Sequence, residues 1–319
     1  MTSQKMILRV AVSLWSIFLA RKLVAEPTVP VDGPSFDAKL QAIDESWNLQ
    51  FAGPAGEIKK LPAAKIVQWG TWPEPRSAKF VALADGSTLA VADVLGIQND
   101  KLLVESDSLA TPTVRLPLAT VAGVVFQAPL SRRQRATLED QLLAATGDSD
   151  RVLLANGDEL AGTIASLNEM SLQLKSALST APLEVARLKA ISLNPRLRAK
   201  PAIAGLRAWI ALRDGSRLQA TKLATKGTEA QITLAGGTML RVPLDEIVAM
   251  QPVGGDVTYL SDLKPAGYKH IPFLNLRWEY QNNRSAEGNS LHAGGQRWEP
   301  LDAVEPADTD DLRPATRPD

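Results

Sequence analysis

The chain has 319 residues, more than one hydrophobic core usually holds, so two or more packed units are expected. Its 35 basic and 35 acidic residues cancel, which disfavours the strong positive field that nucleic-acid binding needs. The absence of cysteine excludes disulfides, thiolate nucleophiles, zinc–thiolate sites and iron–sulfur clusters.

Residues 1–25 have the pattern of a secretory signal peptide. Lys5 and Arg9 precede an apolar run, Val10 to Ala20, that is too short to cross about 30 Å of hydrocarbon as a helix. A cut after Ala25 would leave Glu26 as the first residue of an exported chain with no transmembrane span, in the periplasm, the cell envelope or the extracellular space. A buried N-terminal helix is the alternative.

Three segments share one strand–turn–strand pattern. They are Val81–Leu89, Val152–Leu160 and Ile210–Leu218. In each, an Asp-Gly or Asn-Gly pair supplies the positive φ that a two-residue hairpin needs. The turn glycines Gly86, Gly157 and Gly215 are therefore predicted to be structural.

Each hairpin is followed by an alternating strand and by a closing apolar-Pro-apolar motif, at Leu116–Leu118, Ala181–Leu183 and Val242–Leu244. This internal repeat predicts three β units: unit 1 (78–130), unit 2 (148–200) and unit 3 (205–254). Residues 26–77, the N-terminal unit, are predicted to form a partial copy, in which the alternating strand at 47–51 is not preceded by a recognised opening hairpin. We therefore expect a mainly β fold of small antiparallel units that resemble SH3-like or Sm-like barrels or half-barrels, or that share one continuous sheet.

Residues 131–147 are predicted to form the helix that links units 1 and 2, with Ser131 as N-cap and with Leu138 and Leu142 four residues apart. Its arginines are interpreted as a solvated face or as partners of Glu139 and Asp140. Residues 299–319 contain seven acidic and two basic residues with several prolines, which predicts a disordered tail.

The sequence predicts no catalytic centre, no metal site and no cofactor. The only histidines are His270 and His292, and neither has the neighbours of a nucleophile elbow or a metal site. Among the aromatic residues, Trp47, Trp69, Trp72 and Trp209 are expected in the core or between units. Trp278, Tyr280 and Trp298 stand in a polar stretch and are the candidates for ligand binding, because exposed aromatic rings pack on sugar rings.

The stretch after unit 3 resembles the opening of the NPCBM/NEW2 family. The similarity rests on Val257–Pro265, Tyr268–His270, Pro272–Leu274, Trp278–Tyr280, Asn283–Arg284 and Gly294–Gly295. Members are β-sandwich modules associated with carbohydrate binding, and similar exported proteins of planctomycete-type bacteria carry strand-rich repeats upstream. In this chain Gln296-Arg297-Trp298 and the acidic tail follow the two glycines, so residues 255–298 are predicted to be a truncated N-terminal portion of such a module.

The sequence thus favours a non-enzymatic, exported scaffold or binding protein with glycan or envelope-protein partners. The alternatives are an Sm-like nucleic-acid-binding array, which strong salt-dependent RNA binding would favour, and a hydrolase built around His270 or His292.

The signal-peptide hypothesis predicts that protein isolated from its native host begins at Glu26. Mass spectrometry of the intact chain measures this directly. Met1 retained on protein from the cytoplasmic fraction would contradict export.

Overall fold

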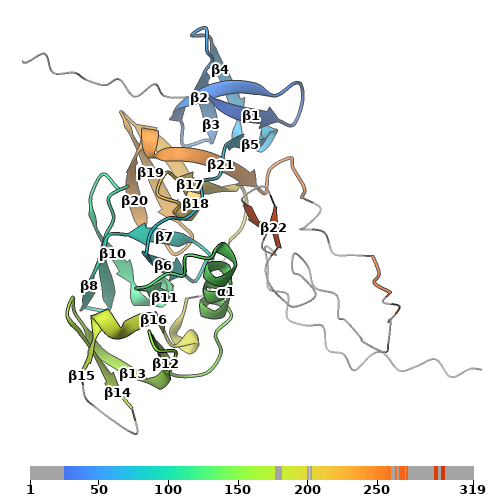
Figure 1. Ribbon diagram of the computed structural model, residues 1–319. Coiled ribbons are helices and arrows are strands. Elements are labelled where there is room, and N and C mark those ends of the chain that lie inside the picture. The colour runs from blue at the N-terminus through green and yellow to red at the C-terminus, as the bar shows by residue number, and fades with distance from the viewer. Residues whose placement is uncertain are drawn as a thin grey trace, which may run out of the picture.

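The computed structural model describes residues 25–176, 182–199, 201, 203–259, 263, 266–269, 271, 291–293 and 296–298. The predictions for residues 1–24 and for the tail at 299–319 lie outside these residues. Within them the protein is mainly β, with one α-helix and antiparallel strand pairing throughout, as the sequence predicted (Figure 1).

The N-terminal unit and unit 1 follow the same connection. In the N-terminal unit the elements are β1 (Glu26–Pro30), β2 (Phe36–Ile43), β3 (Asn48–Ala52), β4 (Ile58–Pro62), the 3-10 turn η1 (Ala63–Lys65) and β5 (Ile66–Gly70). In unit 1 they are β6 (Lys79–Leu83), β7 (Thr88–Val91), β8 (Asp93–Gln98), β9 (Lys101–Glu105), β10 (Thr113–Pro117), η2 (Leu118–Thr120) and β11 (Val121–Val125). The last strand of each unit returns to pair with its first strand. The N-terminal unit, predicted to be a partial copy, therefore has a full set of strands. Its opening loop between β1 and β2 also contains an Asp-Gly pair, Asp32-Gly33, with Gly33 at φ +92°.

Units 2 and 3 repeat this connection. Unit 2 consists of β12 (Asp150–Leu154), β13 (Glu159–Leu167), β14 (Ser171–Lys175), β15 (Pro182–Glu184), η3 (Val185–Arg187) and β16 (Leu188–Ser192), and η4 (Pro195–Leu197) follows it. Unit 3 consists of β17 (Arg207–Leu212), β18 (Arg217–Lys226), β19 (Glu229–Leu234), β20 (Met239–Pro243), η5 (Leu244–Glu246) and β21 (Ile247–Val253). β12 pairs with β16 and β17 with β21. The names SH3-like and Sm-like remain predictions for these units.

The opening turns are longer than predicted. In unit 1 the Leu83 N–H donates to the Ser87 carbonyl (2.8 Å), which leaves a loop of Ala84, Asp85 and Gly86 in place of a two-residue turn. Gly86, Gly157 and Gly215 have φ of +85°, +95° and +89°, so each supplies the left-handed residue that ends a three-residue hairpin loop. The preceding Asp or Asn accepts the N–H of the residue after the glycine, at 2.8–3.1 Å in all three units.

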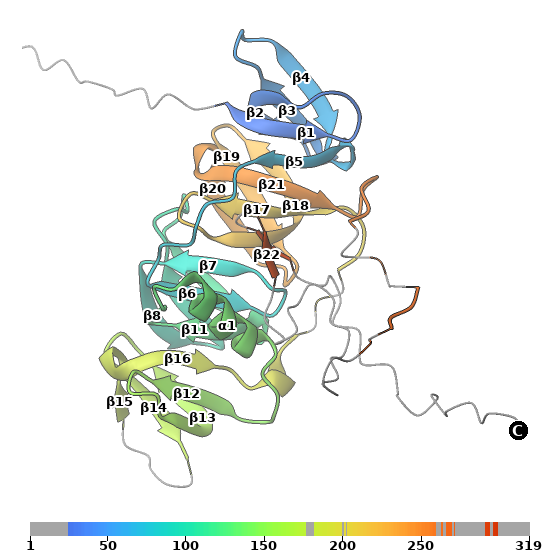
Figure 2. The same ribbon diagram turned by 45° about the vertical axis from the view of Figure 1, so that its right-hand side comes forward.

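The units do not follow chain order in space. Strand pairing joins the N-terminal unit to unit 3 through β5 and β21, unit 3 to unit 1 through β18 and β7, and unit 1 to unit 2 through β11 and β16. Unit 3 therefore lies between the N-terminal unit and unit 1 (Figures 1 and 2). Within each unit the last strand pairs with the first, and neighbouring units also share strand pairing, so strands of all four units belong to one extended sheet.

Two of the three junctions have the same register. At the junction of unit 1 with unit 2, Val124 pairs with Ile191, and at the junction of the N-terminal unit with unit 3, Trp69 pairs with Met250. All four are the fourth residues of the last strands of their units. The two junctions are thus equivalent antiparallel pairings, each with a local pseudo-twofold axis.

The central junction uses a second type of contact, which we call the serine clasp. The Ala90 N–H donates to Ser216 Oγ (2.9 Å), and the Gln219 N–H donates to Ser87 Oγ (2.8 Å). Ser87 and Ser216 occupy equivalent positions after the turn glycine, and both are buried. Between them Thr88 pairs with Arg217, again at equivalent positions. The clasp therefore makes units 1 and 3 pseudo-twofold partners.

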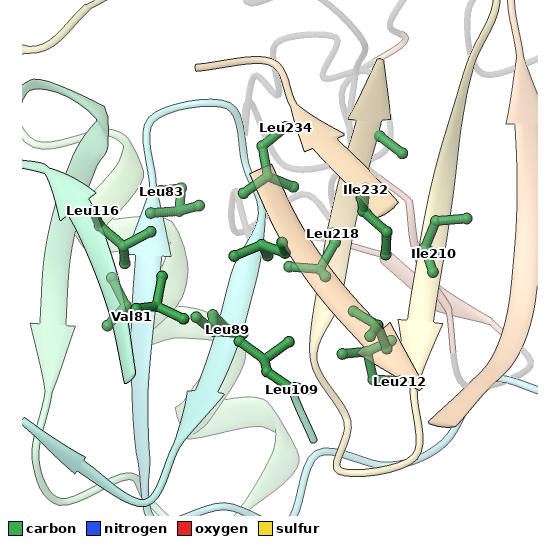
Figure 3. Packing of buried hydrophobic residues seen from close by; sticks show 14 of the residues in the cluster. Val81, Leu83, Leu89, Leu109, Leu116, Ile210, Leu212, Leu218, Ile232 and Leu234 are labelled. Carbon is green, nitrogen blue, oxygen red and sulfur yellow. The ribbon is translucent and has the colours of Figure 1, made fainter. Parts of the chain in front are cut away.

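One large apolar core runs through all four units. Buried residues of all four units belong to one contiguous cluster, and Figure 3 shows the part that units 1 and 3 contribute, with Leu83 and Leu89 from one and Leu218 and Leu234 from the other. Burial of so many aliphatic side chains is the main favourable term in holding the units together.

The helix α1 (Arg132–Leu143) covers the outside of the junction between units 1 and 2. Ser131 precedes it as predicted, although its side chain makes no capping hydrogen bond. Leu138 and Leu142 pack on Phe80 and Ala122 of unit 1 and on Ala190 of unit 2. The helix therefore seals the seam rather than serving only as a link.

Arg198 ties this region together. Its guanidinium donates to the carbonyl oxygens of Leu142 at the end of α1 (2.9 Å), Ala122 in β11 (2.9 Å) and Leu193 after β16 (2.8 Å). Burial lowers the pKa of this arginine. One side chain thus satisfies carbonyls from the helix, unit 1 and unit 2.

We predict that Arg198→Ala lowers the free energy of unfolding by about 2 kcal/mol, because buried carbonyl groups lose the charged donor of their hydrogen bonds. Urea denaturation measures the loss. Arg196→Ala removes an exposed arginine from the same segment and is the control. Equal midpoints for the two variants would contradict the clamp.

Asp85 lies where unit 1 meets unit 3. Its carboxylate accepts the Ser87 N–H (2.9 Å) and the Ala235 N–H of the β19–β20 hairpin. Burial nevertheless raises the pKa of Asp85 above 3.8, because loss of solvation outweighs these hydrogen bonds. The folded protein therefore binds a proton at this site more tightly than the unfolded chain does.

The buried charge of Asp85 costs the folded state stability at pH 7. Because the pKa is raised, this cost is relieved by protonation as the pH falls from 7 toward 3.8, the ordinary value of the group, so the protein gains stability over that range. Asp85→Asn removes this contribution. The difference in unfolding free energy between variant and wild type should therefore shift in favour of wild type between pH 7 and pH about 4. A difference that is constant with pH, or that moves the other way, would show that Asp85 is not held in a desolvated site.

Candidate functional site

A cleft of about 120 Å³ lies where four parts of the chain meet. Its walls come from the linker at 71–78, from Thr88 of unit 1, from the first hairpin of unit 3, and from α1 with its approach. The residues are Trp72, Pro73, Glu74, Pro75, Thr88, Pro129, Leu130, Arg132, Arg135, Ala136, Glu139, Ala211, Gly215, Ser216 and Arg217.

The linker lies against unit 3 because Gly215 permits a close approach. A Cβ atom at Gly215 would stand 2.5 Å from Pro75 Cα, and its φ of +89° also favours glycine. The turn glycine predicted from sequence therefore has a second role. It brings the proline-rich linker onto the hairpin and so forms one side of the cleft.

Two indole rings hold Arg217 at the base of the cleft. The guanidinium carbon lies 4.4 Å from the ring centroid of Trp209 and 5.6 Å from that of Trp72. Trp209 is buried, whereas Trp72 is only partly buried and lines the cavity. These cation–π contacts fix the Trp72 ring against unit 3.

The Trp72 indole N–H has no partner among the described residues. Nε1 is buried, and no hydrogen-bond acceptor lies within reach of it in that part of the chain. A buried donor without an acceptor is costly and uncommon in folded proteins. The indole N–H is thus an unsatisfied donor in a residue that lines the cleft.

One ion pair lies within the opposite wall, and a second joins that wall to the linker. Arg135 Nε lies 3.3 Å from Glu139 Oε1, its Nη1 donates to the Ser77 carbonyl (2.7 Å), and its guanidinium stacks on Phe80 at 4.3 Å. This confirms the predicted partnership with Glu139, and burial lowers the pKa of Arg135 despite the opposing charge. Nearer the surface Arg132 pairs with Glu74. The cleft thus offers an aromatic face, a free donor and paired charges.

The predicted ligand residues fall elsewhere. Trp278, Tyr280 and His270 lie outside the described residues, as does Asn283. Trp298 and His292 stand in a short hairpin of β22 (Leu291–Ala293) and β23 (Gln296–Trp298), where Leu291 pairs with Trp298. Trp47, Trp69 and Trp209 are buried, as expected for core positions.

The first residues of the segment at 255–298 pack across a junction. The Asp256 N–H donates to the Ala64 carbonyl (3.2 Å), and the Tyr259 hydroxyl donates to the Val67 carbonyl (3.0 Å) and lies 3.1 Å from that of Pro252. Ala64 and Val67 belong to the N-terminal unit, whereas Pro252 belongs to unit 3. The segment therefore leaves unit 3 along the junction with the N-terminal unit.

The described residues hold no group of three or more histidine, aspartate or glutamate side chains able to bind a metal ion. None of the helices in that part of the chain has the length and apolar character needed to cross a bilayer.

The sequence predicts Trp72 in the core or between units, and its pattern does not single out Arg217. One feature of the sequence could have indicated the cleft. The linker between two β units places a tryptophan among two prolines and a glutamate. The partner was harder to foresee, because Trp72 meets Arg217 only through the non-sequential order of the units.

A scan against protein-family models finds none that matches this chain, and a search of curated proteins finds no match. The resemblance of residues 257–295 to the NPCBM/NEW2 opening remains a prediction from the residues that carry it.

Proposed function

We propose that this protein is an exported, non-enzymatic binding scaffold. Strand pairing and a shared core support a rigid arrangement of its four units, which suits display of binding surfaces at fixed spacing. The cleft at Trp72 is its ligand site. The observation that carries this assignment is Trp72 itself, which lines the cavity and whose buried indole N–H has no partner among the described residues.

The chemistry of the cleft favours a neutral saccharide. The Trp72 ring supplies an apolar face for the C–H face of a sugar, and its N–H supplies a donor for a ring or hydroxyl oxygen. Glu74 and Arg132 at the rim accept from and donate to hydroxyl groups. A volume of about 120 Å³ is below the roughly 300–1,000 Å³ of drug-sized sites, so the cleft takes one ring of a longer chain.

We predict that the protein binds a neutral oligosaccharide on a glycan array and that Trp72→Ala weakens this binding at least tenfold in calorimetry. Trp72→Phe keeps an aromatic face and removes the N–H, so its affinity should fall between those of wild type and Trp72→Ala. Equal melting temperatures for the three proteins establish that the fold is intact.

The same experiment separates this site from the alternatives. Loss of glycan binding in Trp278→Ala or Tyr280→Ala, with Trp72→Ala unaffected, would move the site to the C-terminal segment. Salt-dependent binding of a single-stranded RNA oligonucleotide, with no glycan bound, would favour the nucleic-acid-binding array. Absence of any glycan binding would defeat the proposal for the cleft.

A further inference from the structure

Unit 2 stands at one end of the assembly (Figures 1 and 2), and one edge of its opening hairpin has no partner among the described strands. Residues 159–162 of β13 pair with β12, and the rest of the strand pairs with β14. The described strands offer no second partner to residues 159–162. A free strand edge presents backbone donors and acceptors to any chain that can pair with it.

The equivalent edges of units 1 and 3 show which residues bind at such an edge when it is occupied. In unit 1 the same edge carries the serine clasp, and Ala90 is buried beneath unit 3 with 6% exposure. Ala161 holds the equivalent position in unit 2 and is exposed. The equivalence follows from the registers, in which Leu89 faces Val81 and Leu160 faces Val152.

Two substitutions distinguish the free edge from the occupied one. Asp158 replaces the clasp serine, and Glu159 replaces Thr88, the residue that faces Arg217. Both acidic side chains are exposed. A carboxylate at position 158 accepts a backbone N–H more strongly than a hydroxyl does, and one at position 159 complements an arginine or lysine across the pair.

The same residues disfavour a second copy of this chain. The clasp sets equivalent positions against each other, so two copies of unit 2 would place Glu159 opposite Glu159. Like charges directly opposite on paired strands are destabilising. Arg151 pairs with Glu159 at 3.1 Å within the unit, but this exposed pair contributes little and can be exchanged for a better one.

We propose that the free edge of β13 at residues 159–162 is a docking edge for a basic β-hairpin from a partner protein, and that Glu159 keeps a second copy of this chain off it. The partner hairpin carries a hydroxyl residue after its turn glycine and an arginine or lysine next. Unit 3 has this chemistry in Asp214-Gly215-Ser216-Arg217, which occupies the corresponding edge of unit 1. The proposal is independent of the cleft and of its ligand.

A charge swap tests the edge with the whole protein. Wild type and Glu159→Arg should each sediment as monomers, because a homodimer of either protein would place two like charges opposite each other at position 159. An equimolar mixture should form a heterodimer at least tenfold tighter than either homodimer. Glu184→Arg makes the same change at an exposed position on β15, away from the edge, and its mixture with wild type should stay monomeric.

A second probe reproduces the partner. A backbone-cyclised peptide copying residues 207–220 should bind wild type, and the same peptide with Arg217→Glu should bind at least tenfold more weakly. Glu159→Arg protein should reverse this preference. Three results would overturn the proposal. The first is a mixture that stays monomeric together with a peptide that does not bind. The second is wild-type dimers formed through this edge, and the third is equal dimerisation of the Glu184→Arg mixture.

Discussion

Two buried serine hydroxyls determine how units 1 and 3 meet at the centre of the assembly. Ser87 and Ser216 each accept a backbone N–H from the opposite unit and so replace the hydrogen bonds that a longer shared ladder would provide. Buried polar groups of this kind are expensive unless both are satisfied, which makes the contact specific as well as stabilising. Unit 2 has aspartate at this position, so units 1 and 3 are the pair that forms it.

The clasp also accounts for the cleft. Because unit 3 docks on unit 1, the linker between the N-terminal unit and unit 1 has to run alongside unit 3, where Pro75 packs on Gly215 and Trp72 stacks near Arg217. The helix that seals the next junction completes the opposite wall. The candidate ligand site is thus a product of the unit order, and no unit contains it alone.

Local pattern was sufficient for the mainly β character, the opening hairpins, the positive φ of the turn glycines and the helix with Leu138 and Leu142 facing inward. These features depend on neighbours in sequence. The spatial order of the units depends on which edges complement each other over more than a hundred residues, and the pattern of apolar positions is nearly the same in every unit. The difference between Ser87 or Ser216 and Asp158 was visible in the sequence, but its meaning requires knowing which edges meet.

The position of unit 3 has a consequence for biosynthesis. The N-terminal unit and unit 1 are complete by residue 125, whereas the strands that cover their exposed edges end at residue 253. At about 5–20 residues per second, the nascent chain carries two uncovered strand edges for on the order of ten seconds. Such edges are templates for aggregation, so this interval is when a chaperone would matter most. A product of early termination before residue 205 would keep both edges permanently open.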